Sequence, residues 1–284
     1  MAGPTTLPIA ALDGHFLPIA EARISPLDRG FLFGDGVYEV VAVYGGRPLL
    51  IDEHLARLQR SLRELGIANP HGDDGWRALL TELVERNGGG DMGLYLQVTR
   101  GADRGRDHGF PAGLAPTVFA MATPLRPFDP DRAAVSAITA ADPRWGRCDI
   151  KTTSLIANVL LRQQAVAAGA GETILLRDGW LTEGSGSTVV IIERGDLVAR
   201  PEGHDVLPGT TIRLVRALAE ACGIRYREEA ISEARLRAAA EIWLTAALRG
   251  VAPVTRLDGA AVGSGEPGPL WRKVAEAYEL LNRS

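Results

Sequence analysis

Lysine is almost absent from this chain of 284 residues: of its 31 lysines and arginines, only Lys151 and Lys273 are lysines. An arginine side chain stays protonated in proteins, whereas a lysine can lose its proton. A lysine in such a chain is therefore a candidate for chemistry that needs a neutral amine. A solvated helix face explains Lys273. Lys151 ends a short Cys-Asp-Ile segment just before a helical pattern, where it is either a nucleophile facing a cleft or a surface charge.

Cysteine, excess positive charge and long apolar runs are scarce too. Cys148 and Cys222 are too few for a disulfide framework and lack Cys-x-x-Cys spacing, so we expect a reducing compartment and no metal site. A net charge of −4 disfavours a nucleic-acid partner. No apolar run approaches the roughly 20 residues that span a bilayer. Residues 1–12 lack the basic start of a signal peptide. We expect a cytoplasmic protein that acts on small molecules, without a membrane partner.

The first part of the chain reads as a small α+β domain. A Gly45-Gly46 turn joins two strand-like runs into a predicted hairpin. Asp52 is expected to cap a helix whose leucines recur at helical spacing and which ends at Gly66. We expect strands over 37–44, 47–51, 94–99 and 117–122, and helices over 52–65 and 75–86.

A linker is predicted at 124–130, because three prolines in seven residues fit neither a helix nor a central strand. This predicts an N-terminal domain over 1–123 and a larger domain over 131–284 that carries Lys151. In the larger domain we expect helices over 154–168, 211–222 and 269–281, and strands over 172–176, 180–182, 188–192, 196–199 and 241–245. The fold class is α/β, or α+β, with two domains.

Three further segments are candidate anion or cofactor sites. Residues 207–211 open a helix whose N–H groups suit a phosphate, or they form a plain N-cap at Thr210 or Thr211. Residues 182–188 set one carboxylate among small hydroxyl residues, or form an ordinary loop. Residues 106–108 place an arginine near a histidine, a pair that could bind the carboxylate of a substrate. Alternatively, they belong to an ordinary solvent-exposed loop. Taken together with an amine nucleophile, these features fit a pyridoxal-phosphate enzyme.

Four segments, at residues 28–39, 53–58, 148–151 and 181–185, resemble the signature segments of fold-type IV pyridoxal-phosphate enzymes. Within that group the chain is most similar to D-amino-acid (D-alanine) transaminases. Its other relatives are branched-chain aminotransferases, (R)-amine transaminases and aminodeoxychorismate lyases. The resemblance implies a D-amino-acid aminotransferase-like fold, with a small N-terminal and a larger C-terminal domain and pyridoxal 5'-phosphate at their interface.

The resemblance also implies roles for individual residues. Lys151 falls on the Schiff-base lysine, which later moves a proton as a free amine, and Glu183 on the acid that pairs with the pyridine nitrogen. The phosphate ligands are implied to be Arg57, Ser187, Thr210 and Thr211. An amino acid and a 2-oxo acid would react in turn by a ping-pong mechanism through the pyridoxamine 5'-phosphate form.

The substrate carboxylate is implied to be held by Tyr38, Arg106 and His108. Val40 alternates with Tyr38 along the strand and should face the same pocket. In the family the arginine and the histidine come from the neighbouring subunit, which implies a homodimer.

Two departures from the D-alanine pattern keep other reactions open. The loop over 100–110 is one residue longer, which bears on the reach of Arg106 and His108. Ala247 stands where a hydroxyl usually assists the phosphate, and residues 247–250 look somewhat like aminodeoxychorismate lyases. Arg249 could bind a second carboxylate or simply face solvent. The alternatives are such a lyase, a transaminase for branched-chain L-amino acids or (R)-amines, and a cofactor-binding protein without turnover.

Overall fold

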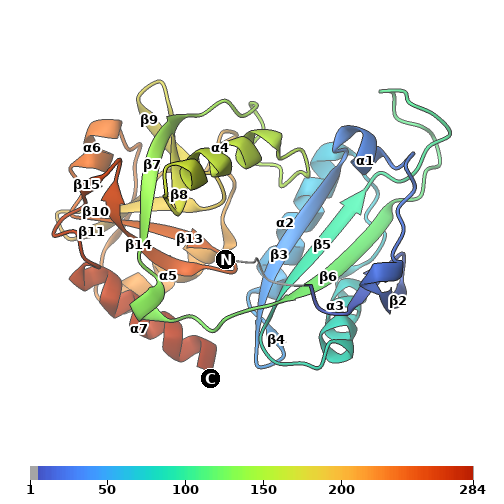
Figure 1. The fold of residues 1–284 in the computed structure, drawn as a ribbon, viewed down its shortest axis with the longest axis horizontal. Helices are drawn as coiled ribbons and strands as arrows, with labels where there is room; N and C mark the ends of the chain where they lie inside the picture. Colours follow the sequence, from blue (N-terminus) through green and yellow to red (C-terminus); the bar gives the residue numbers. More distant parts are fainter. Residues whose placement is uncertain (1–5, 284) are drawn as a thin grey trace. The chain divides into compact units, whose positions relative to one another are not determined.

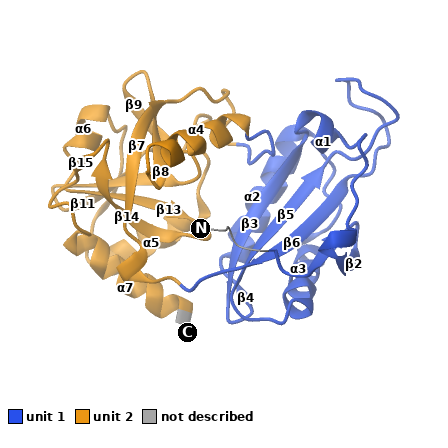
Figure 2. Cartoon of the chain, in the orientation of Figure 1, with its two compact units in different colours: residues 1–127, 150–155 blue, residues 128–149, 156–284 orange. Residues whose placement is uncertain are grey.

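The computed structural model describes residues 6 to 283 and divides the chain into two compact units (Figures 1 and 2). Unit 1 comprises Met1–Pro127 and Ile150–Leu155, and unit 2 comprises Phe128–Asp149 and Ile156–Ser284. The first five residues of the stretch 1–12, considered above as a signal peptide, lie outside the described part. Among the described residues, no helix is both long and apolar enough to span a bilayer.

Unit 1 is built on a six-stranded sheet in the order β2-β1-β6-β5-β3-β4, with antiparallel neighbours throughout. The predicted hairpin is confirmed, but its second strand is short because the chain turns into a helix at Ile51. The strands are β1 (Ile9–Leu12), β2 (His15–Pro18), β3 (Gly36–Tyr44), β4 (Arg47–Pro48), β5 (Met92–Thr99) and β6 (Thr117–Pro124).

Two long helices pack on this sheet, α2 against β3 and α3 against β1 and β6. The predicted cap at Asp52 is wrong: the N-cap is Leu50 in the left-handed conformation, and Asp52 lies in the first turn. The predicted end at Gly66 is confirmed, since this residue takes a positive φ of 62°. The helices of unit 1 are η1 (Ile19–Glu21), α1 (Arg29–Phe33), α2 (Ile51–Leu65) and α3 (Asp73–Arg86).

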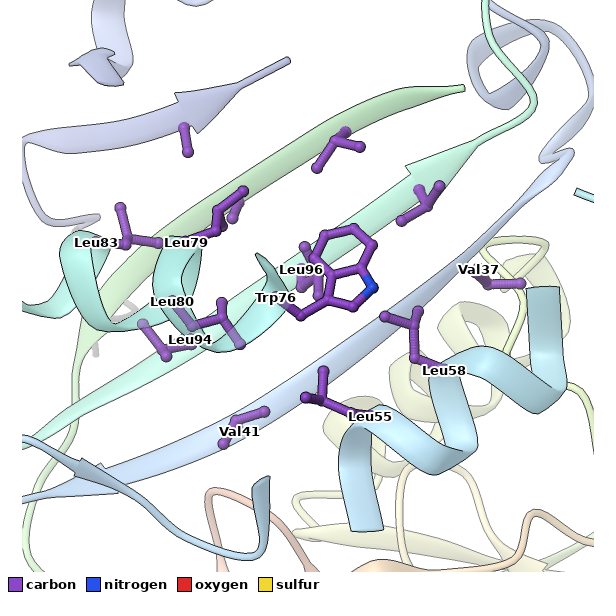
Figure 3. Close-up of a cluster of buried hydrophobic side chains, with 14 of the residues drawn as sticks. Val37, Val41, Leu55, Leu58, Trp76, Leu79, Leu80, Leu83, Leu94 and Leu96 are labelled. Atoms are coloured by element: carbon purple, nitrogen blue, oxygen red, sulfur yellow. The ribbon is translucent and has the colours of Figure 1, made fainter. Parts of the chain in front are cut away.

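The core of unit 1 lies between these helices and one face of the sheet (Figure 3). Trp76 of α3 is fully buried there, and Leu58 of α2 lies near Val37 of β3. Side chains alternate along a strand, so Tyr38 and Val40 point to the other face and stay half-buried.

The segment Ile150–Leu155 belongs to unit 1, although the sequence-based division puts it in the second domain. Ile150 is buried in the unit 1 core, and Thr152 forms an antiparallel bridge with Val37. The backbone N–H of Tyr38 donates to the carbonyl of Lys151 over 3.0 Å. Lys151 is thus fixed beside β3 by contacts between residues far apart in the chain.

Unit 2 is built on a nine-stranded mixed sheet in the order β12-β11-β10-β13-β14-β7-β8-β9, with β15 paired to β14. The expected hairpins β8–β9 and β10–β11 are confirmed as antiparallel pairs. The strands are β7 (Val135–Ala141), β8 (Glu172–Arg177), β9 (Trp180–Gly184), β10 (Thr188–Glu193), β11 (Asp196–Ala199), β12 (Tyr226–Glu228), β13 (Glu241–Ala246), β14 (Gly250–Leu257) and β15 (Ala260–Ala261).

The helices of unit 2 pack on this sheet, α4 against β7 and β8, α5 against β13, and α7 against β14 and α5. The three predicted helices are confirmed with shifted ends, because a terminal residue depends on local capping. Lys273 on α7 is exposed, as expected. The helices are η2 (Pro130–Arg132), α4 (Ile156–Ala167), α5 (Thr210–Ala221), α6 (Glu233–Arg237) and α7 (Pro269–Arg283).

Candidate active site

Lys151 is anchored through its backbone, and its side-chain amine lies against the ring of Tyr38. Its N–H donates to Ser61 Oγ on α2 over 3.2 Å. Its Nζ lies 4.2 Å from the centre of the Tyr38 ring, so the amine rests on an aromatic face. The structure therefore brings together Lys151 and Tyr38, two of the residues predicted from the sequence.

Arg57 lies on the face of α2 that meets β3, where it pairs with Glu39. Its Nε and Nη2 each donate to one Glu39 oxygen over 2.8 Å, and His54 Nδ1 lies 2.7 Å from the same carboxylate. Burial by itself would raise the pKa of Glu39, but the charge and hydrogen bonds of Arg57, with those of His54, lower it to about 2. The buried carboxylate is therefore ionised and holds the guanidinium of Arg57 in one orientation.

Arg106 and His108 lie together on the loop between β5 and β6, with exposed side chains. Both rest against Phe33 of α1: the His108 ring centroid is 5.2 Å from the Phe33 centroid, and the Arg106 guanidinium is 5.1 Å from it. Among residues 6 to 283, neither residue forms a hydrogen bond or ring contact with Tyr38. The residues predicted to bind the substrate carboxylate thus lie, within this chain, in two places. Tyr38 lies on β3 with half-buried Val40, and Arg106 and His108 lie on the loop.

Glu183, at the end of β9 in unit 2, is a buried acid with fixed partners. Arg144 Nη1 forms an ion pair with its Oε1, and the N–H of Leu207 donates to its Oε2 over 3.1 Å. Arg144 is itself held by Asp142, which accepts from its Nε and Nη2. Burial would lower the pKa of Arg144, but the hydrogen bonds to Asp142 and the charge of Glu183 raise it, so the guanidinium stays charged.

The hydroxyl of Ser187 already donates a hydrogen bond within unit 2. Its Oγ donates to Glu172 Oε2 over 2.8 Å, and Ser185 Oγ donates to the other oxygen of the same buried carboxylate. Arg249 lies at the edge of this cluster, with Nη1 3.6 Å from Glu172 and Nη2 donating to the carbonyl of Gly171. The interpretation of Arg249 as simply solvent-facing is therefore wrong, because its guanidinium lies against a buried acid.

The start of α5 fits a phosphate group. The predicted N-cap at Thr210 or Thr211 is wrong: the N-cap is Gly209, and no side chain caps the helix. Thr210 and Thr211 are buried in the first turn, which contains no acidic residue. A Cβ on Gly209 would lie 2.8 Å from Thr188 Oγ1, so the close approach there needs a glycine. Helix N–H groups without a side-chain cap, in a first turn that contains no acidic residue, are a favourable environment for an anion.

A cavity of about 350 Å³ in unit 2 adjoins this helix start. Its lining includes Glu183, Thr188, Leu207 and Gly209. Glu183 and the N-terminus of α5 therefore line the same cavity within unit 2.

The sequence did not reveal the charged residues that form hydrogen bonds and ion pairs with the predicted site residues. Glu39 stands inside the segment 28–39, and a charged residue in an otherwise apolar strand was the available signal. Arg144 and Glu172 belong to no local motif, and only the folding of distant segments brings them to Glu183 and Ser187.

Comparison with known proteins gives one consistent result. The family model for amino-transferase class IV matches residues 36–257. The chain is 42% identical over 268 residues to a D-alanine aminotransferase of Bacillus licheniformis, covering 94% of each protein. It is 36% identical to a D-alanine aminotransferase of Staphylococcus aureus, covering 94% of this chain and 95% of that protein.

Solved structures confirm the expected fold. The Escherichia coli branched-chain amino acid aminotransferase superposes with a TM-score of 0.89 at 23% identity, over 96% of this chain and 94% of that one, which is a likeness of fold alone. A hypothetical aminotransferase from Mycobacterium tuberculosis in its PLP-bound form gives a TM-score of 0.83 at 28% identity, over 95% of this chain and 97% of that one.

Proposed function

Because the chain belongs to the amino-transferase class IV family, which uses pyridoxal phosphate, we propose that it moves the amino group of a D-amino acid, such as D-alanine or D-glutamate, to a 2-oxo acid. The observation that carries the proposal is the 42% identity, over 94% of both lengths, to a protein named D-alanine aminotransferase. The likeness to branched-chain enzymes at 23% identity supports only the shared fold.

The residues of unit 1 supply the reactive amine and part of the substrate pocket. Bound pyridoxal phosphate supplies an aldehyde and an electron-withdrawing ring. Lys151 would hold that aldehyde covalently and, once released, would move a proton between the substrate α-carbon and C4' of the cofactor, which requires a neutral amine part of the time. Tyr38, with its ring 4.2 Å from Nζ, and Val40 would border the substrate. Arg57 would contact the phosphate, in the orientation set by Glu39.

The residues of unit 2 would hold the two ends of the cofactor. Glu183, kept in place by Arg144 and the Leu207 N–H, would face the pyridine nitrogen and keep it protonated. The first turn of α5, with Thr210 and Thr211, would bind the phosphate. Ser187 would also bind the phosphate, either through its backbone or through its hydroxyl once this has rotated away from Glu172.

The proposal includes a homodimer in which Arg106 and His108 bind the carboxylate of a substrate in the partner's site. Apolar side chains exposed on α4 support a second copy as the partner, because such patches on a soluble protein mark interaction surfaces: they are Ile156, Val159, Leu160 and Val166. Cys148 and Cys222 are both free, which fits the cytoplasmic location that we also propose.

The first experiment is the visible spectrum of the purified holoenzyme with D-alanine or L-leucine added separately. We expect D-alanine alone to remove the absorption band of the bound aldehyde form, and 2-oxoglutarate to restore it. Loss of the band with L-leucine instead would assign the branched-chain reaction. No response to either would reject both, and aminodeoxychorismate and an (R)-amine would be added next.

The shared site is tested by mixing two impaired variants, Lys151→Ala and Arg106→Ala, under conditions that exchange subunits. A mixed dimer has one site with both residues intact, so we expect about a quarter of the wild-type activity at low D-alanine from an equimolar mixture. Activity no higher than the sum of the two variants would mean that the site is not shared.

A further inference from the structure

The loop over residues 100–116, between β5 and β6, carries Arg106 and His108. Loops of this length without helix or strand are usually functional or disordered. The side chains of Arg106 and His108 are exposed, so burial of these side chains does not hold the loop. Hydrogen bonds that involve residues 27–29 and Arg100 instead tie its backbone to the rest of unit 1.

Arg29 of α1 holds the backbone of the loop where the two residues lie. Its Nη1 donates to the carbonyl of Asp107 over 2.6 Å, and its Nη2 donates to the carbonyl of His108 over 3.2 Å. Its Nε donates to Asp35 over 2.8 Å, and the residue is only 3% exposed. A guanidinium is a rigid planar fork, so these bonds fix two successive carbonyls of the loop relative to α1.

Phe33, one turn further along α1, supports the side chains. The Arg106 guanidinium lies 5.1 Å from its centroid, and the His108 ring meets it edge to face at 61°. The guanidinium of Arg29 lies 4.9 Å from the same ring. One aromatic ring thus touches both loop residues and the arginine that holds the loop backbone.

The start of the loop is fastened to the same acid. Arg100 donates to Asp35 from Nε and Nη2, and to the carbonyls of Leu65 and Gly66 at the end of α2. Asp35 therefore joins Arg29 and Arg100, and through them α1, the loop and α2.

We propose that Arg29 and Phe33 are positioning residues that pre-order the loop, so that Arg106 and His108 bind the substrate carboxylate without first being ordered. This inference rests on the proposed function, because it takes a carboxylate as the ligand of the loop. Ordering the loop in advance reduces the entropy lost on binding, which strengthens substrate binding more than it speeds the chemical step.

The test uses Arg29→Met and Phe33→Leu holoenzymes, with Arg23→Met as the matched control. Arg23 is an exposed arginine before α1 that also donates to two backbone carbonyls, those of Ala20 and Ala22. Trypsin can cut after Arg104 and Arg106, so the rate of cleavage in the loop, identified by fragment mass, reports its order independently of activity. We expect both variants to be cut at least about tenfold faster than wild type, and the control to match wild type.

Kinetics provide the second readout. We expect KM for D-alanine to rise at least about tenfold in both variants while kcat changes much less. Arg29→Lys keeps the charge but not the fork, and should restore only part of the wild-type KM. Should Arg29→Met fail to fold, Phe33→Leu tests the same loop without removing a buried charge.

Two results would overturn the proposal in distinguishable ways. Wild-type cleavage rates in folded Arg29→Met and Phe33→Leu would show that these residues do not order the loop. Faster cleavage with unchanged KM, together with an unchanged KM in Arg106→Ala, would show that the loop is ordered by α1 but that the assigned carboxylate ligand, and with it that part of the proposed function, is wrong.

Discussion

Arg57 and Glu39 form a two-pronged ion pair in the interior of unit 1, with two N–H groups of the arginine donating to the two carboxylate oxygens over 2.8 Å each. One partner stands on α2 and the other on β3, so the pair also joins a helix to the sheet. His54 adds a third contact to the same carboxylate. The orientation of the predicted phosphate-binding arginine is therefore decided by an acid on another element.

Replacing Glu39 with Gln should destabilise unit 1. The variant leaves a buried guanidinium facing a neutral amide, and removing one partner of such a pair costs about 3 kcal/mol. Urea unfolding followed by tryptophan fluorescence, with Trp76 in the core of the unit, measures the loss. Glu82→Gln breaks an exposed pair with Arg86 and should cost less than about 0.5 kcal/mol. Equal effects of the two substitutions would contradict the structural role of Glu39.

The same acid should make stability depend on pH in the acid range. The pKa of Glu39 in the folded protein is about 2, against an ordinary value of 4.5. A depressed folded pKa stabilises the protein above pH 4.5, and this stabilisation declines as the pH falls from 4.5 toward 2. The midpoint of urea unfolding should therefore fall more steeply for wild type than for Glu39→Gln over this window. Parallel curves for the two proteins would show that Glu39 is not the acid responsible.

Lys151→Ala should abolish transamination and leave the fold intact, because within residues 6 to 283 the side chain of Lys151 contacts the Tyr38 ring and makes no hydrogen bond. Borohydride reduction of the holoenzyme followed by mass spectrometry should find the cofactor attached to Lys151. Lys273→Ala removes the one other lysine, which is exposed on α7, and should behave as wild type. Retained turnover in Lys151→Ala would refute the role of the amine.

Gly209→Ala should weaken binding of the phosphate. The added methyl group would approach Thr188 Oγ1 at 2.8 Å and Ile212 at 3.0 Å, and so displace the first turn of α5. We expect affinity for pyridoxal phosphate to fall by about tenfold, or 1.4 kcal/mol, with little change for pyridoxal, which lacks the phosphate. Gly146→Ala meets no atom within 4 Å and is the control. Equal losses for both ligands would mean that the substitution acts elsewhere.

Arg144→Met should lower both the stability and the activity of the protein, because Glu183 loses its ion-pair partner. The variant leaves two buried acids, Asp142 and Glu183, without their shared cation, at a cost of about 3 kcal/mol in stability. Activity at saturating cofactor should fall as well, because Glu183 loses its fixed position. Arg177 also pairs with Asp142 but is more exposed, so Arg177→Gln should have a smaller effect on both measurements. The prediction fails if Arg144→Met matches that control.

Most of the secondary structure and the chemical parts of the site could be read from the sequence. Hydrophobic periodicity depends only on neighbours along the chain, and it predicted helices such as α2 and hairpins such as β8–β9. The short strands β1 and β2 were not predicted, although they form a local hairpin through Asp13-Gly14. The pairing of β1 with the distant strand β6 could not be read from the local sequence. The scarcity of lysine and the four family segments pointed to Lys151, Arg57 and Glu183 in the same local way.

The tertiary structure alone decided which groups hold these residues. Glu39 reaches Arg57, Arg144 reaches Glu183, and Glu172 accepts a hydrogen bond from the Ser187 hydroxyl. The segment of Lys151 joins unit 1 through hydrogen bonds to β3, although the chain around it belongs to unit 2. The reason is physical: local patterns select helix or strand, whereas a buried charge needs a partner, and only the folded chain brings that partner within hydrogen-bonding distance.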